Sequence, residues 1–161
     1  MSGWSVRTRG GDSAGASQAF AIEESLGYLV NRAARLMARQ LAVALRPAGV
    51  GIGQWAVLMF LWARDGMSQA ELSKVVAIEP PTMVRTLDRM VRDGFVTRMG
   101  DPKDGRITRI HLTDRGRALR DELVPLAVQV NAANLGRLTP AEGRTLQRLL
   151  AKLIDQPEAE T

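Results

Sequence analysis

The chain has 161 residues, enough for one domain or for one small domain with an added assembly element, and its composition is ordinary for a globular protein, with 45% hydrophobic and 24% charged residues. It contains no cysteine, which excludes disulfides, thiolate metal sites and thiol redox sensing. The formal net charge of +5 makes polyanions the first partners to consider. The excess is local, because residues 80–117 hold nine Arg and Lys against five Asp, whereas residues 118–161 hold five basic and six acidic residues.

No segment predicts a membrane span or a secretion signal. The longest uninterrupted apolar run, Trp55 to Ala63, is far shorter than the roughly 20 residues that a membrane-spanning helix needs. The N-terminal residues contain no apolar signal core. We therefore expect a cytoplasmic protein without a membrane partner. Residues 1–18 are rich in Gly, Ser and Arg without periodicity, which predicts a disordered tail.

A long amphipathic helix is predicted over Phe20 to Arg46, where apolar residues recur every three or four positions. Pro47 and Gly49 are expected to end it. A second helix, from Gln54 to about Arg64, carries so much apolar surface that we expect it to be buried. The glycines between the two helices follow a helix rather than a strand, so we interpret them as a turn and not as a nucleotide-binding loop.

A helix-turn-helix is predicted next along the chain. Ser68 and Glu71 have the spacing of a capping box and open a short helix. After a brief turn, Pro80 and Pro81 occupy the first turn of another helix, which runs to Asp93 and stops at the following glycine. Two short helices joined by a tight turn are the core of a helix-turn-helix.

A β-hairpin and two further helices complete the chain. The runs FVTRM and RITRIHL flank an Asp104-Gly105 turn and predict a two-stranded wing. A long helix follows from Asp114 towards Gly136, and Pro125 is expected to kink it. The last helix begins at a second capping box and carries an apolar stripe that ends at Ile154.

The predicted fold is mainly α, with a winged helix-turn-helix core and a two-stranded β wing, flanked by N- and C-terminal dimerisation helices. We expect a disordered tail at 1–18, an N-terminal dimerisation helix at 19–49, a DNA-binding core at 50–113 and C-terminal dimerisation helices at 114–161. The flanking helices carry more apolar stripe than the small core needs for itself, so a homodimer is predicted.

The helix from Pro80 to Asp93 carries the candidate DNA-reading surface. Its predicted inward face consists of Met83, Val84, Leu87, Met90 and Val91. Its predicted outward face consists of Thr82, Arg85, Thr86, Arg89 and Arg92. A helix of this width fits the major groove of DNA, where an arginine can bond guanine O6 and N7 together. We expect Arg85 to read a base, Arg89 and Arg92 to contact phosphates, and Asp88 to orient a neighbouring arginine.

The hairpin tip carries a second candidate contact. Lys103 and Arg106 lie on a loop narrow enough for the minor groove, whose negative potential attracts cationic side chains. Asp101 and Asp104 argue against simple charge attraction, and Asp104 is expected to hold Arg106 by an ion pair. The alternative interpretation of these cations is a solvated basic surface.

The segment MSQAELSKVVAIEPPTMVRTLDRMVRDGFVTRMGDPKDGRITRIHLTDRGRAL resembles the winged-helix core of MarR-family transcriptional regulators, and IEPPTMVRTLD resembles the SlyA-like branch most. The resemblance extends more weakly over residues 20–154. It implies a dimer formed by the N-terminal and two C-terminal helices, and a recognition helix with Pro81, Thr82 and Arg85. It also implies a wing arginine, here Arg106, that follows an aspartate, here Asp104.

Two positions depart from the family pattern. The family's wing commonly reads Asp-Arg-Arg, but this chain has a glycine at position 105, so one tip cation is missing and minor-groove contact is expected to be weaker. Gly51 replaces the usual hydroxyl cap before the second helix, at a cost of only a few tenths of a kcal/mol. Family members often bind small aromatic acids, and the resemblance implies a pocket lined by Trp55 and Met59. The alternative is that both residues belong to the core.

Other function classes find less support in the sequence. The single histidine, His111, lies in a basic β-run, so neither a His-based catalytic triad nor a multi-histidine metal site can be built. We expect no enzyme, no cofactor and no metal. A winged helix that binds nucleic acid non-specifically or binds RNA is the main alternative to a sequence-specific, ligand-responsive repressor on a pseudo-palindromic operator. A protein-interaction module with an idle basic face is a further one.

Overall fold

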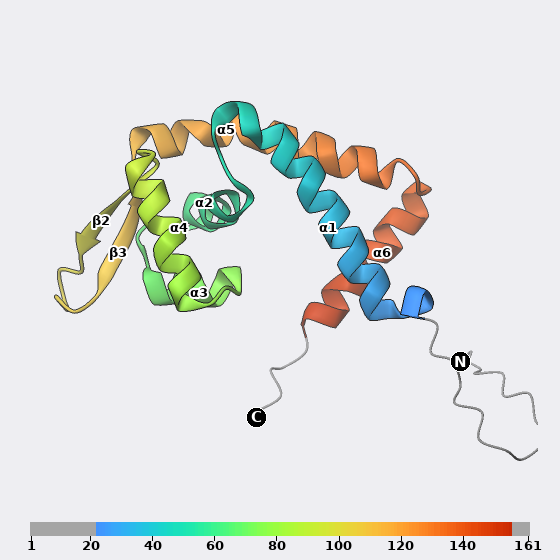
Figure 1. Cartoon of the computed structure of the whole chain (residues 1–161), viewed down its shortest axis with the longest axis horizontal. Coiled ribbons are helices and arrows are strands. Elements are labelled where there is room, and N and C mark those ends of the chain that lie inside the picture. Colours follow the sequence, from blue (N-terminus) through green and yellow to red (C-terminus); the bar gives the residue numbers. More distant parts are fainter. Residues whose placement is uncertain (1–21, 156–161) are drawn as a thin grey trace, which may run out of the picture.

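The computed structural model describes residues 22–155 (Figure 1). The tail expected at 1–18 and the expected helix start at Phe20 lie outside the described residues. Within them the helices are α1 (Leu26–Leu45), α2 (Ile52–Ala63), α3 (Gln69–Val76), α4 (Pro80–Arg92), α5 (Asp114–Leu135) and α6 (Pro140–Ile154), and the strands are β1 (Met67–Ser68), β2 (Val96–Gly100) and β3 (Thr108–Leu112). The mainly α fold with a winged helix-turn-helix is confirmed.

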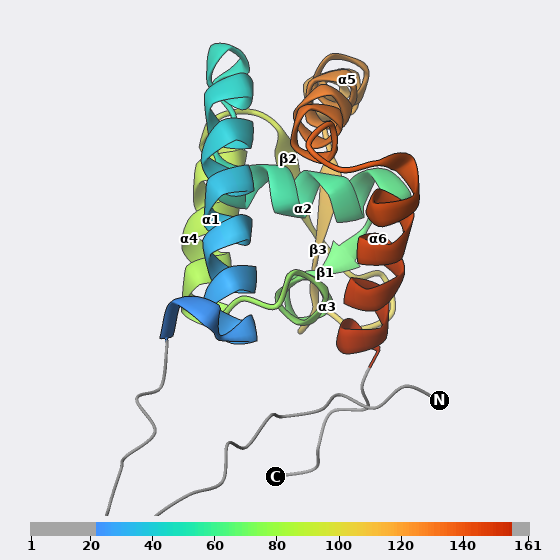
Figure 2. The same ribbon diagram turned by 90° about the vertical axis from the view of Figure 1, so that its right-hand side faces the viewer.

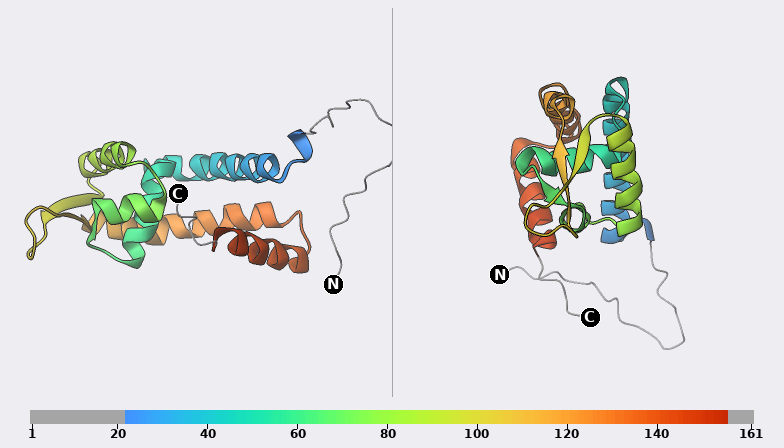
Figure 3. Two further views of the ribbon diagram at one scale, coloured as in Figure 1. Left: turned by 90° about the horizontal axis from the view of Figure 1, so that it is seen from below. Right: turned by 90° about the vertical axis from the view of Figure 1, so that its left-hand side faces the viewer.

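The helices α2, α3 and α4 gather with the sheet at one end of the molecule, and the hairpin of β2 and β3 projects from that end (Figure 1). Helix α5 leaves this winged core and runs beside α1, and α6 turns back at the far end (Figures 2 and 3). A hydrogen bond from Asn134 Nδ2 to Gln40 Oε1, 2.7 Å long, joins α5 to α1. The winged core is therefore held on two long helices whose other ends extend away from it.

One hydrophobic core fills the space between the helix-turn-helix, the sheet and the start of α5. Its buried side chains come from every element of the winged core, and those that are fully buried include Leu58, Leu61, Leu72, Met83, Leu87, Met90, Phe95, Ile110 and Leu123. These apolar side chains fix the orientation of α3 and α4, because each helix turns its own apolar face to the same core. The position of the candidate DNA-reading surface is thus set by burial on the opposite side of α4.

The sheet has one strand more than the predicted two-stranded wing. Strand β3 lies in the middle and pairs antiparallel with both neighbours, in the order β1-β3-β2. Val96 faces Leu112 and Gly100 faces Thr108 in the hairpin, while Met67 faces Ile110 on the other side. The two residues of β1 are too short a run to show alternation, so the sequence gives no periodic signal for this strand.

Two helices begin at other residues than expected, and capping explains both. Helix α1 begins at Leu26, inside the range expected to be helical, because Ser25 Oγ accepts the N–H of Tyr28 at 3.3 Å. Helix α2 begins at Ile52 rather than at Gln54. There the Gln54 side chain reaches back, and its Oε1 accepts the Gly51 N–H at 2.8 Å. This bond satisfies the N–H of the N-cap residue, while Gly51 has no side chain to accept an N–H from the first turn of α2.

The predicted helix ends agree with the structure. Gly49 and Gly94 both adopt left-handed backbone, with φ of 72°, after the ends of α1 and α4. Helix α5 continues on both sides of Pro125, which lies inside it. Within residues 22–155 no single helix is long and apolar enough to cross a membrane. Leu26–Ala48 and Ile52–Ala63 pass that test only when taken together, and they are bent by 81°.

Candidate nucleic-acid interface

The turn between α3 and α4 is built from local capping interactions. Ser68 Oγ accepts the N–H of Glu71 at 3.2 Å, and the Glu71 carboxylate accepts the N–H of Ser68 at 2.7 Å. These hydrogen bonds hold the pKa of Glu71 below its usual range, the Ser68 N–H first among them. Ala77 takes a left-handed conformation, with φ of 55°, and reverses the chain into Pro80. The predicted capping box and the proline start of α4 are therefore present.

Helix α4 presents a cationic outer face. Its exposed residues include Pro81, Thr82, Arg85, Asp88, Arg89 and Arg92. Thr82, Arg85, Asp88 and Arg89 together line a shallow hollow on this face. The Arg89 side chain is folded along the helix, where its Nε donates to the backbone oxygen of Arg85 at 3.3 Å. The face thus offers several hydrogen-bond donors of positive charge beside one carboxylate.

Thr86 does not belong to this outer face, and its expected outward position is wrong. It is only 2% exposed and lies beside Gly53 at the start of α2. The buried residues of α4 are Met83, Thr86, Leu87 and Met90, which follow the spacing of a helix turn. Val84 and Val91 are instead 37% and 39% exposed. The two valines were expected to face inward because they are hydrophobic. The helical spacing instead puts Thr86 on the buried face of α4.

The wing tip is a tight loop between β2 and β3 with Lys103, Asp104 and Arg106 exposed. Asp101 Oδ1 accepts the backbone N–H of Lys103 at 2.7 Å and of Asp104 at 3.1 Å. These bonds and the Arg109 guanidinium hold the pKa of Asp101 below its usual range, with the Lys103 N–H as the largest cause. The loop therefore keeps a definite shape although its residues face solvent.

The expected ion pair between Asp104 and Arg106 is replaced by a different contact. Asp104 Oδ1 accepts the backbone N–H of Arg106 at 3.0 Å, so the carboxylate orients the backbone and not the guanidinium. A carboxylate that accepts the backbone N–H two residues ahead of it forms an Asx turn, which is common in tight loops. The Arg106 side chain extends from the loop as an exposed cation.

Two charged residues that the sequence did not assign to the site, Arg98 and Arg109, take part in its contacts. Asp88 pairs with Arg98 of β2, 2.8 Å away, rather than with an arginine of its own helix. Arg109 of β3 contacts Asp101 at the base of the wing tip and donates to the backbone oxygen of Gly66 at 2.9 Å. These partners are separated by 8 to 43 positions in the chain, so no local pattern reveals them.

The C-terminal end of α4 is tied to the neighbouring helices. Gln54 Nε2 of α2 donates to Asp93 Oδ2 at 2.8 Å, and Arg115 of α5 donates to the Asp93 backbone oxygen at 2.9 Å. The bond from Gln54 is the main cause that holds the pKa of Asp93 below its usual range. Arg115 also stacks over the Phe95 ring, with 5.0 Å to the ring centroid. These contacts connect α2 and α5 directly to the C-terminal end of α4.

Trp55 and Met59, the candidate ligand residues, differ in their surroundings. Trp55 is 7% exposed and packs edge-on against Trp62, with ring centroids 5.6 Å apart. Trp62 in turn donates to the Gly116 oxygen at 2.9 Å. Met59 is 48% exposed on the surface of α2. In the single chain Trp55 is thus part of the core, and Met59 faces outward.

The described residues hold no group of three or more His, Asp or Glu side chains placed to bind a metal ion. Two short helices joined by a tight turn, followed by a β-hairpin with cations at its tip, define a winged-helix nucleic-acid-binding protein.

Comparison with known proteins identifies the family. Residues 52–108 match the family model described as the MarR family. The HTH-type transcriptional repressor Rv2887 from Mycobacterium tuberculosis is 32% identical over 133 residues, which are 83% of this chain and 96% of that protein. The chain belongs to the MarR family and is a DNA-binding transcriptional regulator. Its place in the SlyA-like branch stays a prediction.

Solved structures agree with this assignment. A mutant of MarR from E. coli, complexed with operator DNA, is 30% identical with a TM-score of 0.75, over 80% of this chain and 92% of that chain. The Mycobacterium tuberculosis MarR-family protein Rv2887, in complex with salicylic acid, is 32% identical with a TM-score of 0.66, over 80% of this chain and 96% of that chain.

Proposed function

We propose that the chain is a ligand-responsive repressor that acts as a homodimer on a pseudo-palindromic operator, with α4 in the major groove and the wing in the minor groove of each half-site. One observation carries the proposal: α4 buries one face in the core and exposes Thr82, Arg85 and Arg89 on the other. An α-helix fits the major groove, and the wing projects from the same end of the molecule (Figure 1).

Each candidate contact has its own role in this proposal. Arg85, one turn into α4, reads a base edge, and Thr82 together with the start of the helix at Pro81 sets its approach. Arg89 and Arg92 neutralise phosphates. Lys103 and Arg106 enter the minor groove, which they recognise by shape and potential rather than by a base code.

The two-fold arrangement is supported by where apolar surface lies outside the winged core. Exposed apolar residues crowd on α1 and α6 and include Leu26, Leu29, Leu36, Met37, Leu146, Leu149, Leu153 and Ile154. We assign 19–49 and 114–161 to dimerisation and 50–113 to DNA binding. A two-fold dimer on one face of the duplex requires half-sites about one helical turn apart, roughly 10 base pairs between centres.

The protein acts by binding alone, without catalysis, in the cytoplasm. The relatives that are named transcriptional repressors support this. A small aromatic anion relieves repression, which is supported by the relative that was solved with salicylic acid. If salicylate neither quenches the fluorescence of the buried Trp55 and its neighbours nor shifts DNA affinity, the ligand response is rejected and the DNA-binding function stands.

The central experiment selects bound duplexes from a random pool with the full chain. It then measures salt series of binding isotherms for Arg85→Ala and Arg106→Ala on the selected and a scrambled duplex. Arg85→Ala is expected to lose about 1–3 kcal/mol on the selected duplex only. Arg106→Ala is expected to weaken both duplexes alike and to flatten the salt dependence.

Two outcomes contradict this assignment. A pool from which no symmetric motif emerges, or an RNA duplex that competes as well as DNA, supports a non-specific winged helix. If Arg85→Ala weakens both duplexes equally while Arg106→Ala alone abolishes discrimination, the roles of helix and wing are reversed.

A further inference from the structure

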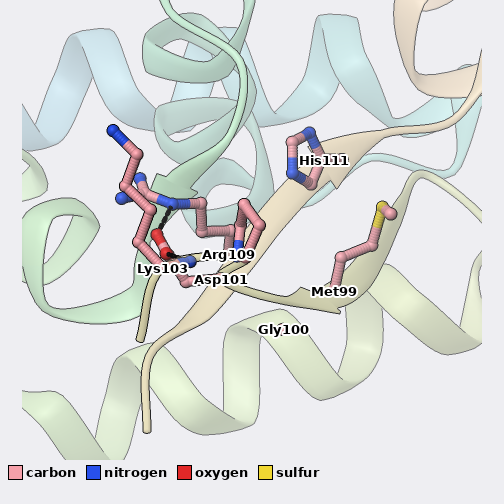
Figure 4. Close-up of a pocket in the computed structure, with 7 residues that line it drawn as sticks. Met99, Gly100, Asp101, Lys103, Arg109 and His111 are labelled. Atoms are coloured by element: carbon pink, nitrogen blue, oxygen red, sulfur yellow. Dashed lines mark hydrogen bonds and ion pairs between the residues drawn. The ribbon is translucent and has the colours of Figure 1, made fainter. Parts of the chain in front are cut away.

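Asp101 is the most buried carboxylate near the wing tip, although the loop around it is exposed. Its side chain is 6% exposed, and both of its oxygens are used. Oδ1 accepts the backbone N–H groups of Lys103 and Asp104. Oδ2 faces the guanidinium Nε of Arg109 (Figure 4). One carboxylate therefore shapes the tip of the wing and attaches it to the middle strand of the sheet.

Arg109 continues this connection into the helix-turn-helix. Its Nη1 donates to the backbone oxygen of Gly66 at 2.9 Å, in the turn before β1. The same guanidinium lies 3.8 Å from the Glu71 carboxylate, which caps the start of α3. The side chain is about one third exposed, at 35%. A continuous set of polar contacts thus runs from the wing tip through Arg109 to the beginning of α3.

Asp104 provides the natural comparison, because it lies in the same loop and carries the same charge. Its carboxylate accepts only the neighbouring N–H of Arg106, and an asparagine could accept that bond as well. Asp101, in contrast, needs its second oxygen for Arg109, and an asparagine would present an N–H₂ group there. The charge of Asp101 is therefore required by its contact, and that of Asp104 is not.

We propose that Asp101 and Arg109 are positioning residues for DNA binding, which hold the wing cations Lys103 and Arg106 at a fixed place relative to α3 and α4 without touching DNA themselves. The inference rests on the proposed function, because it assumes that the wing contacts the duplex. Pre-ordering matters because a side chain that must be immobilised on binding costs about 0.5–1.5 kcal/mol.

A positioning role for Asp101 and simple electrostatics predict opposite effects on DNA affinity when its charge is removed. DNA is a polyanion, so removing a carboxylate from the contact surface should tighten binding if charge alone matters. If Asp101 positions the wing, removing its charge should weaken binding instead. The expected loss for Asp101→Asn is about two- to tenfold in affinity for the selected duplex, as the ordering cost of one side chain implies.

The experiment compares Asp101→Asn with Asp104→Asn in the full chain, at one salt concentration, on the duplex selected from the random pool. Asp104→Asn makes the same change in charge and shape three positions away, and it is expected to bind more tightly than the wild type. Thermal unfolding of each variant checks that it is folded. Tighter binding by Asp101→Asn overturns the proposal.

A double-mutant cycle separates positioning from general destabilisation. The change Asp101→Asn is repeated in a chain that also carries Lys103→Ala and Arg106→Ala. If Asp101 acts through these cations, the added change causes no further loss of affinity. An equal loss in both backgrounds overturns the proposal. Arg109→Lys, which keeps the charge but loses the planar fork, is expected to weaken binding as Asp101→Asn does.

Failure of the proposed function is recognised separately. In that case the wild-type chain selects no duplex, or Lys103→Ala with Arg106→Ala leaves affinity unchanged, before any variant at position 101 is considered. If the wing cations matter and Asp101→Asn has no effect, only the positioning inference is wrong.

Discussion

At the scale of single residues, Asp88 is the one carboxylate on the outer face of α4 that we place against DNA. Its ion pair with Arg98 spans 2.8 Å, and the two side chains are 57% and 34% exposed. An exposed pair of this kind contributes at most about 1 kcal/mol to stability. The pair therefore matters mainly for the charge that α4 presents to DNA. Arg98 neutralises the Asp88 carboxylate, which would otherwise repel phosphate.

We expect Arg98→Gln to weaken DNA binding roughly tenfold, because it removes a cation and leaves Asp88 uncompensated. The free energy of unfolding should change by less than about 1 kcal/mol. Adding Asp88→Asn should restore most of the affinity. Isotherms at fixed salt and urea denaturation of the three chains measure both effects. A double variant that binds no better than Arg98→Gln contradicts this account.

Gly116 is a second residue whose identity the fold requires. A Cβ at this position would lie 2.0 Å from the Phe95 backbone oxygen, so α5 could not approach the end of α4 as it does. We expect Gly116→Ala to lower the free energy of unfolding by about 3 kcal/mol. Gly53→Ala is the matched control, since a Cβ there meets its nearest atom, Thr86 Oγ1, at 3.9 Å. Equal stability of the two variants in urea would contradict the close approach.

At the scale of elements, Asp65 joins three of them at the end of α2. Its Oδ1 accepts the Leu112 N–H of β3 at 2.9 Å, and its Oδ2 accepts from Arg117 of α5 at 2.9 Å. His111 Nδ1 lies 3.7 Å from the same carboxylate. Partial burial raises the pKa of Asp65, but the hydrogen bonds from Leu112 and Arg117 outweigh it, so the pKa lies below its ordinary value of 3.8.

The lowered pKa of Asp65 gives its contribution to stability a defined pH dependence. Because the ionised form is favoured in the folded chain, the contribution is present above pH 3.8 and is lost as the pH falls through the folded-state pKa. Asp65→Asn should lower the free energy of unfolding by about 1–3 kcal/mol at pH 7. Between pH 7 and pH 3 this variant should lose less stability than the wild-type chain does. Urea denaturation at pH 7, 4 and 3 tests this, with the exposed Asp121→Asn as control. Parallel losses in wild type and Asp65→Asn would refute the assignment.

The elements that could be predicted from the sequence are those with local signals. The capping box of Ser68 and Glu71, the glycine stop of α4 and the hairpin turn all depend on residues within a few positions of each other. The pairs of strand β1, the contacts of Asp65 with Leu112 and Arg117, and the contact of Arg109 with Gly66 join residues 41 to 52 positions apart, so they require the folded chain. The candidate site divides in the same way: its cations follow from the sequence pattern, whereas the contacts of Arg98 and Arg109 are visible only in the structure.

At the scale of the whole molecule, the single chain leaves much of its apolar surface uncovered. Leu36 and Met37 of α1 border a hollow of about 450 Å³, which is completed by Leu135 of α5, by Leu138 of the loop that follows it, and by Leu146 and Leu150 of α6. Ile154 is 79% exposed at the end of α6. Soluble chains rarely leave contiguous apolar patches of this kind exposed, and a second copy related by two-fold symmetry covers the same patch on both chains.

Helix α6 offers a direct test of the dimer. Leu149→Glu with Leu153→Glu places two carboxylates on the apolar stripe of α6, and we expect the chain to become monomeric, because a buried unpaired charge costs several kcal/mol. Ala151→Glu is the matched control, since it adds a carboxylate on the opposite side of the same helix. Sedimentation at micromolar concentration should give a monomer for the first chain and a dimer for the control.

Loss of the dimer should reach the DNA interface without touching it. When two modules are linked, the second half-site is bound at a high effective concentration, and this advantage is on the order of 100-fold or more. The monomeric variant should therefore bind the full operator at least about 100-fold more weakly and bind a single half-site as the wild-type chain does. If half-site affinity falls as well, the carboxylates have disturbed the winged core. If the variant sediments as a dimer, α6 does not hold the two chains together.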